Sequence, residues 1–186
     1  MNQQVRVSPA SDWRVAFTAA DFEHMLKLGA FADMRVELVK GELEKMMPAL
    51  PSHGERNLSV ALLLHEALAG MPIKMGSDLA IRIDETSVRA ADIALYPASL
   101  PSDRVPDGKD ILLAIEISDT TLSRDLGIKL FDYGRAGVPH YWVIDAAAQV
   151  VQAMCEPNAE GYAKRAVVRF GDPLPVPGTD RSIIID

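Results

Sequence analysis

An apolar run in the middle of the chain most strongly constrains the fold. Residues 111–117 read Ile-Leu-Leu-Ala-Ile-Glu-Ile, with Glu116 as the one charged member. A strand with one face in water alternates apolar and polar residues, whereas a strand covered on both faces is apolar throughout. The run therefore predicts a central strand in a sheet that carries helices on both faces.

The flanking segments supply helices for these faces. Thr18 is predicted to cap a first helix because Asp21 stands three residues later, as in a capping box. Ser52 is predicted to cap a second helix that runs to about residue 69. A third helix is expected over residues 123–137, directly after the central strand.

Alternating runs predict the remaining strands. Residues 35–39 and 42–46 flank a Lys-Gly turn, which indicates a β-hairpin. Further strands are expected over residues 73–83, 91–96, 139–145 and 149–154, with edge strands over 162–170 and 182–185. Together these elements predict an α/β fold with a mixed central sheet flanked by helices.

Composition limits the class of protein. The chain has 186 residues, and we expect residues 1–17 to be loosely ordered and residues 18–186 to form one domain. One cysteine, Cys155, allows no internal disulfide, which fits a reducing cytoplasm. No apolar run reaches the roughly 18 residues of a membrane span, so no membrane partner is expected. The net charge of −7 disfavours tight non-specific DNA binding but is compatible with a local acidic site.

Two carboxylates lie in segments that are otherwise apolar. Asp92 opens the run Asp-Ile-Ala-Leu, and Glu116 lies near the end of the central strand. Two such carboxylates on neighbouring buried strands would repel, and a divalent cation between them removes that cost. Oxygen ligands suit Mg²⁺ or Mn²⁺, so the pair predicts a metal site. The alternative is that each carboxylate caps a strand end or pairs with an arginine.

The helix expected after the central strand offers a cation for this site. Asp125, Lys129 and either Asp132 or Tyr133 recur at helical spacing and share one side. Apolar neighbours of Lys129 indicate that its ammonium group points toward the sheet, and the alternative is an ordinary Asp125–Lys129 surface pair. Because side chains alternate along a strand, Ser118 lies on the same side as Glu116.

His53 has two interpretations. It follows Pro51 and Ser52 at the start of the second helix, where it either faces the acidic site or helps to cap the helix. Other common sites are excluded by the sequence. It contains no phosphate-binding glycine loop, no Cys/His zinc set and no G-x-S-x-G nucleophile elbow.

Taken together, these motifs resemble the Uma-type family of restriction-endonuclease-like proteins, within the wider PD-(D/E)XK nuclease group. The resemblance covers roughly residues 18–155 and depends on the combination of motifs, since any single one is weak. The segments that carry it are Arg35-Val-Glu37, Ser52-His53, Ala91-Asp92, Ile115-Glu116-Ile117-Ser118, Arg124-Asp125, Lys129, Tyr133 and residues 136–145.

The resemblance implies a restriction-endonuclease-like core and assigns roles to particular residues. The metal ligands would be Asp92 and Glu116. The catalytic lysine would be Lys129, displaced from the strand position that Ser118 occupies. Glu37 would be the acidic residue that such folds supply from an N-terminal element, available to a second metal or a metal-bound water. Ser118, His53, Asp125 and Tyr133 are secondary candidates.

One departure from the family pattern is visible. Ala91 stands where a proline usually precedes the first acid. Proline restricts the backbone there but contributes no ligand atom, so the change leaves the chemistry intact.

These features predict a Mg²⁺- or Mn²⁺-dependent endonuclease that hydrolyses DNA. One alternative is a non-catalytic module of the same fold that binds nucleic acid or protein, which Ser118 in place of lysine and the acidic composition favour. Another is a metal-dependent hydrolase of a different phosphoester. A homodimer is compatible with the sequence, because exposed edges such as the hairpin over residues 139–154 can pair across a two-fold axis.

Overall fold

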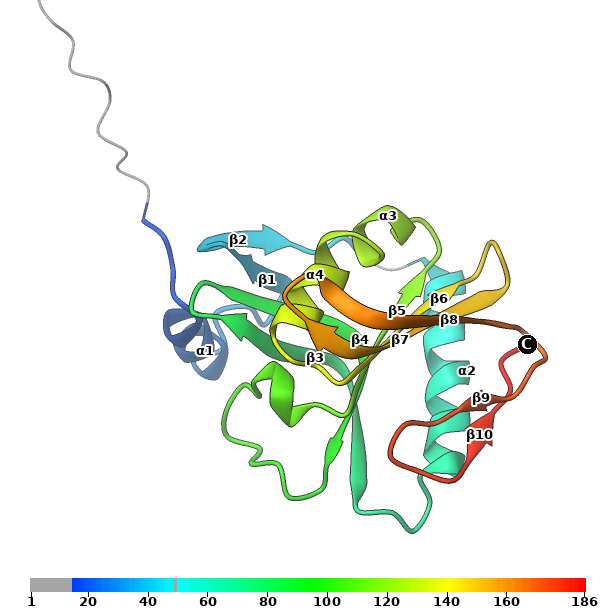
Figure 1. Cartoon of the computed structure of the whole chain (residues 1–186). Helices are drawn as coiled ribbons and strands as arrows, with labels where there is room; N and C mark the ends of the chain where they lie inside the picture. Colours follow the sequence, from blue (N-terminus) through cyan, green and yellow to red (C-terminus); the bar gives the residue numbers. More distant parts are fainter. Residues whose placement is uncertain (1–14, 49) are drawn as a thin grey trace, which may run out of the picture.

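The computed structural model describes residues 15–48 and 50–186 (Figure 1). Its helices are α1 (Ala19–Lys27), α2 (Pro51–Ala67), the 3-10 helix η1 (Gly108–Asp110), α3 (Leu122–Asp125) and α4 (Ile128–Arg135). Its strands are β1 (Val36–Val39), β2 (Glu42–Lys45), β3 (Ile73–Asp84), β4 (Ser87–Pro97), β5 (Leu113–Ser118), β6 (His140–Asp145), β7 (Val150–Asn158), β8 (Gly161–Arg169), β9 (Leu174–Pro175) and β10 (Ser182–Ile183).

Within the described residues, eight strands form one mixed sheet. The order is β2-β1-β4-β5-β6-β7-β8, and β3 pairs with β4. The pair β5–β6 is parallel, whereas β4–β5 and β6–β7 are antiparallel. Residues 113–118 are all buried, so the prediction of a central strand covered on both faces is confirmed.

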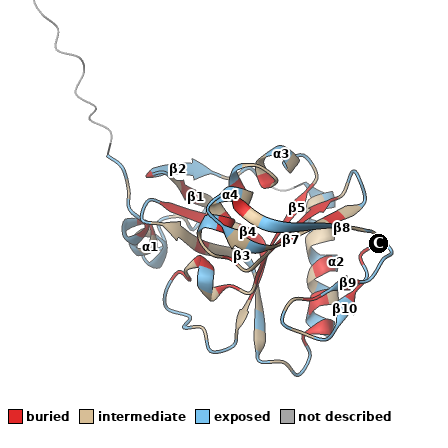
Figure 2. Ribbon diagram, in the orientation of Figure 1, coloured by how far each residue is buried: buried red, intermediate tan, exposed pale blue. Residues whose placement is uncertain are grey.

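The two faces of the sheet carry separate cores. On one face, α2 and the ribbon β9–β10 cover apolar residues of β4 to β7, among them Ile115 and Trp142. On the other, Tyr133 of α4 packs against Ala114 and Tyr141. Figure 2 shows burial concentrated in the central strands, whereas β2 and β8 are largely exposed. Helices therefore cover both faces, as predicted.

Local sequence signals explain several element boundaries. Thr18 caps α1, since its hydroxyl accepts from the Asp21 amide at 3.1 Å and its own amide donates to Asp21 at 2.9 Å. The capping-box prediction is thus confirmed. The cap predicted at Ser52 is wrong. Helix α2 begins at Pro51 with Leu50 as N-cap, because proline fits the first helical position, where its missing N–H is not needed.

Three other predicted elements need correction. The helix expected over residues 123–137 is two short helices, broken at Gly127. The strand expected over 91–96 starts earlier, at Ser87, because it forms a long hairpin with β3. Residues 182–185 add no strand to the main sheet. Instead, β10 pairs with β9 in a separate ribbon beside α2 (Figure 1).

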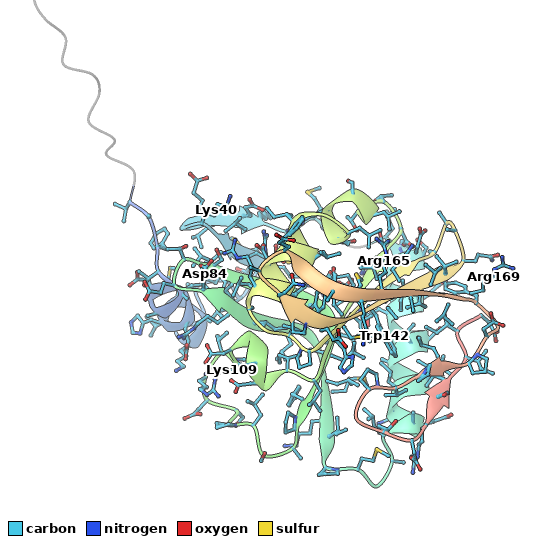
Figure 3. All side chains as sticks on the ribbon, viewed as in Figure 1. Lys40, Asp84, Lys109, Trp142, Arg165 and Arg169 are labelled. Carbon is cyan, nitrogen blue, oxygen red and sulfur yellow. The ribbon has the colours of Figure 1, made fainter. Side chains whose placement is uncertain are left out.

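The hairpin over residues 139–154 was predicted to have an exposed edge for pairing, and this is wrong. Strand β6 pairs with β5, and β7 pairs with β8, so both edges of the hairpin are covered. The outermost strand at this end is β8, marked in Figure 3 by the labelled residues Arg165 and Arg169. Of the N-terminal segment, residues 1–14 lie outside the described residues, and the Phe17 amide donates to the Gly41 carbonyl at 2.9 Å.

Candidate active site

Strands β4 and β5 bring Asp92 and Glu116 to neighbouring positions. Their register pairs Leu95 with Leu113 and Ile93 with Ile115, so Asp92 and Glu116 are the next residues along the two strands. The Ile117 amide donates a hydrogen bond of 2.7 Å to Asp92 Oδ2. This bond crosses from one strand to the other and holds the Asp92 carboxylate beside Glu116.

Glu116 is buried, at 3% exposure. Its Oε1 accepts hydrogen bonds from Lys129 Nζ and from the Tyr133 hydroxyl, each at 2.8 Å. Burial raises the pKa of Glu116 to about 8, with a further contribution from the charge of Asp92 and opposition from Lys129. A cation that binds here therefore has to displace a proton across the neutral pH range.

Lys129 lies in the interior and not on the surface, with 2% of the residue exposed. It reaches the site from the first turn of α4, and its Nζ also donates to the Ala90 carbonyl at 3.2 Å. Burial alone would lower the pKa of Lys129, but the charges of Glu116 and Glu37 outweigh burial and raise it. The structure thus has the ammonium group pointing at the sheet, and the surface-pair alternative is wrong.

Glu37 contacts the site through Lys129. Its Oε1 accepts from the Ala90 amide at 3.1 Å and lies 3.3 Å from Lys129 Nζ, while Oε2 accepts from Arg89 at 3.0 Å and from Arg124. Burial would raise the pKa of Glu37, but the charges of Lys129 and Arg124 outweigh burial and lower it. Glu37 is therefore an ionised carboxylate surrounded by donors, and its role toward a second metal stays a prediction.

The secondary candidates also gather around the carboxylates. His53 Nε2 lies 3.5 Å from Asp92 Oδ1, and hydrogen bonding to Asp92 raises the pKa of His53. The structure assigns no side-chain cap to α2, so His53 faces the site instead of capping the helix. Asp125 is buried, which raises its pKa, while the hydrogen bond from Thr121 and the charge of Lys129 oppose this shift. The Thr121 hydroxyl lies 2.5 Å from Asp125 Oδ2.

These side chains line a cavity of about 280 Å³. Its walls include His53, Asp92, Glu116, Asp125 and Lys129, together with the cations Arg35, Lys45 and Arg124. A larger cavity of about 730 Å³ lies between β8 and the C-terminal ribbon, but its lining is mainly apolar and includes no carboxylate. The smaller cavity, which is lined by the carboxylates and cations, is therefore the candidate site.

Sequence reasoning missed one participant in this cluster. Arg89 is 2% exposed and lies between Glu37 and Asp132, with nitrogen–oxygen distances of 2.7–3.0 Å. The one available signal was its place between apolar or small residues, Val88 and Ala90, in a segment now seen to be strand β4. No spacing rule connects it to Glu37 or Asp132, because those partners come from other elements.

The described residues offer no cluster of three His, Cys, Asp or Glu side chains able to hold a metal ion. A closed structural site of the zinc type needs four protein ligands, and this part of the chain does not provide them. What the site does provide is a pair of carboxylates from adjacent strands with a lysine beside them. That donor set suits a hard cation that keeps part of its water shell.

The sheet with helices on both faces and the buried carboxylate–lysine cluster define an α/β protein with one acidic candidate site. The fold is similar to a crystal structure described as "a putative nuclease belonging to DUF820 from Anabaena variabilis ATCC 29413", with a TM-score of 0.62 and 16% sequence identity. The similarity covers 87% of this chain and 89% of that chain. At this identity the likeness concerns the fold.

The sequence identifies the family. Residues 19–183 match the family described as "Uma2: Putative restriction endonuclease", and the chain belongs to this family. The resemblance and the fold class predicted from the sequence are therefore confirmed. No curated protein sequence matches the chain. None of the helices among the described residues is long and apolar enough to cross a membrane.

Proposed function

We propose that this protein is a divalent-cation-dependent endonuclease that hydrolyses phosphodiester bonds of DNA. The observation that carries the proposal is the convergence of two carboxylates and a lysine at one cavity, with Lys129 Nζ 2.8 Å from Glu116 and Asp92 on the adjacent strand. Membership of a family described as restriction endonucleases supports the nuclease class.

Asp92 and Glu116 are the proposed ligands for Mg²⁺ or Mn²⁺. Within the described residues, the hydrogen bonds to Glu116 fall on Oε1, and Asp92 accepts the Ile117 amide on Oδ2. Mg²⁺ in proteins is commonly bound by one or two carboxylates, with water and phosphate completing its shell. When bound, the cation supplies neutralisation of phosphate charge and a lowered pKa of the attacking water.

The protein's own groups have separable roles in this proposal. Lys129 stabilises the negative charge that develops on the phosphate, since an ammonium group in a cavity shielded from water acts strongly on such charge. The Ile117 amide holds Asp92 in place through its 2.7 Å bond. His53 Nε2, 3.5 Å from Asp92 Oδ1, orients that carboxylate through its other oxygen. Glu37 Oε1, 3.3 Å from the same Lys129 Nζ, provides a second carboxylate contact to the ammonium group.

Calorimetric titration with Mn²⁺ and Mg²⁺ tests the proposal without a guess at the DNA sequence. Wild type, Asp92→Ala and Glu116→Ala are compared, and the two variants control for diffuse binding to an acidic surface. We expect wild type to bind a stoichiometric ion and both variants to lose it. Metal-dependent cleavage of plasmid and single-stranded DNA by wild type, absent in both variants, completes the test.

The opposite outcome favours the binding module. If wild type binds cations no better than the variants, and no DNA is cut, the same fold acts without catalysis, in line with Ser118 at the usual lysine position. If the protein binds the metal and cleaves a small phosphoester but not DNA, the result would favour a metal-dependent hydrolase of a different phosphoester. Cytoplasmic location and a homodimer stay predictions, and sedimentation of the purified chain measures its oligomeric state.

A further inference from the structure

The lysine of this site comes from a helix, so its position relative to Glu116 is not set by the strand that carries Glu116. Helix α4 has eight residues and begins directly after Gly127, with no side-chain cap at its N-terminus. Lysine is also a flexible side chain with a point charge, which needs external contacts to hold one geometry. Something outside α4 has to fix the helix against the sheet.

Arg89 of β4 makes such a connection. Its Nε and Nη2 lie 2.8 Å and 2.7 Å from Asp132 Oδ2 on α4, and its Nη1 donates to Glu37 Oε2 on β1 at 3.0 Å. One guanidinium group thus joins the three elements β4, α4 and β1. Asp132 stands three residues after Lys129, so the two side chains share one side of α4.

Glu37 closes this arrangement. It contacts Arg89 through Oε2 and lies 3.3 Å from Lys129 Nζ through Oε1, so Arg89 constrains the lysine both through the helix and through the carboxylate. Arg89 itself touches neither Asp92 nor the Glu116 oxygen that holds the lysine. The other charges of the network are Arg124, which also binds Glu37, and Glu116, which binds Lys129.

The burial of these charged groups indicates that they position Lys129. Arg89 and Glu37 are 2% and 1% exposed. Well-packed apolar residues often stabilise a fold at least as well as a buried ion pair, because desolvation offsets the attraction between the charges. A rigid, planar guanidinium with several donors gives what apolar packing does not, a defined angle and distance between the elements it joins.

We infer that Arg89 is a positioning residue, which holds Lys129 against Glu116 by clamping α4 to the sheet through Asp132 and Glu37. The placement of Lys129 is a property of the folded chain. The effect on turnover rests on the proposed nuclease function.

Acylation of Lys129 by acetic anhydride, followed by mass spectrometry, tests the placement without any turnover. The variants are Arg89→Met and the milder Asp132→Asn, which keeps the side-chain shape and serves if Arg89→Met fails to fold. The matched control is Arg181→Met. Arg181 also joins two elements through its guanidinium, donating to the Ala67 carbonyl at 2.9 Å at the far end of α2.

We expect Lys129 to be acylated faster in Arg89→Met and Asp132→Asn than in wild type, and at the wild-type rate in Arg181→Met. All proteins are compared at the same interval below their melting temperatures. An acylation rate of Lys129 that is the same in wild type and in the folded Arg89→Met and Asp132→Asn variants would overturn the inference.

Kinetics supply the second measurement if wild type cuts DNA. We expect Arg89→Met to lower kcat by about 10²-fold, as for a misplacement near 1 Å, with KM nearly unchanged. In a Lys129→Ala background the same substitution should cause no further loss, because no lysine is left to place. An additional loss in that background would mean that Arg89 acts independently of Lys129. If wild type cuts nothing, the proposed function fails while the acylation result still decides the placement.

Discussion

Lys129 Nζ lies 2.8 Å from Glu116 Oε1, although the two residues are 13 positions apart and belong to a helix and a strand. The wider nuclease pattern that the sequence resembles places a lysine two residues after the acid, where this chain has Ser118. A lysine on the same strand would be positioned by the strand itself. Here the distance depends on how α4 packs, which makes the proposed catalytic arrangement sensitive to contacts outside the cavity.

Removal of Lys129 should slow DNA cleavage strongly without loss of metal binding. In Lys129→Ala we expect kcat for DNA cleavage to fall by about 10²–10³-fold, the effect of losing one group that stabilises transition-state charge. Titration with Mn²⁺ should still show a stoichiometric ion, because Asp92 and Glu116 remain. Full activity in this variant would show that Lys129 is not the catalytic cation.

A lysine at position 118 of β5 should partly compensate for the loss of Lys129. Ser118 is 1% exposed and has the same strand parity as Glu116, so Ser118→Lys places an ammonium group on the same side of the sheet. We expect Ser118→Lys combined with Lys129→Ala to cut DNA faster than Lys129→Ala alone. The comparison is informative when both proteins melt cooperatively. No gain in a folded double variant would mean that the helix position is required.

Metal binding should tighten as the pH rises. Because the pKa of Glu116 is raised to about 8, its carboxyl group carries a proton below that pH and must release it to bind a cation. We expect the Kd for Mn²⁺ to fall by up to about tenfold per pH unit between pH 6 and 8, with proton release detectable in buffers of different ionisation enthalpy. Glu116→Gln, which lacks the titrating carboxyl group, is the control for proton release and should show none on addition of Mn²⁺. A flat pH profile in wild type would contradict the raised pKa.

Glu37 should stabilise the fold above about pH 4.5. Its pKa is lowered from 4.5 in the folded state, so its contribution is present above that value and is lost as the pH falls through the folded pKa. At pH 7 we expect Glu37→Gln to lower the unfolding free energy by about 3–5 kcal/mol, the cost of breaking a buried ion pair. Urea unfolding at pH 7 and pH 3 measures this, and the difference between the proteins should shrink at pH 3.

Replacement by alanine should have opposite effects on stability at two glycines. A Cβ at Gly134 of α4 would lie 2.1 Å from the Gly161 carbonyl oxygen of β8, so Gly134→Ala should destabilise by about 1–3 kcal/mol. A Cβ at Gly54 of α2 meets no atom within 4 Å, so Gly54→Ala should stabilise by up to about 1 kcal/mol. Thermal unfolding of both variants measures these changes in stability. Equal changes in the two variants would contradict the close contact between α4 and β8.

Element types were largely predictable, because they depend on local patterns. The apolar run at residues 111–117 predicts a buried strand, and Thr18 with Asp21 predicts a capped helix, as the structure shows. Boundaries failed where two local signals compete. Pro51 displaced Ser52 as the start of α2, and Gly127 divided a helix that periodicity alone extends through it.

By itself, the sequence determined the α/β order, the buried central strand and the two acids that stand out in apolar segments. Hydrophobic periodicity is a short-range property, and a charge in an apolar strand is visible without a partner. Only the tertiary structure decided which cations pair with which acids. Arg89 meets Asp132 and Glu37 across 43 and 52 positions, and Arg124 meets Glu37 across 87. Such partners are chosen by the packing of distant elements, since an ion pair acts only over a few ångströms and leaves no spacing rule in the chain.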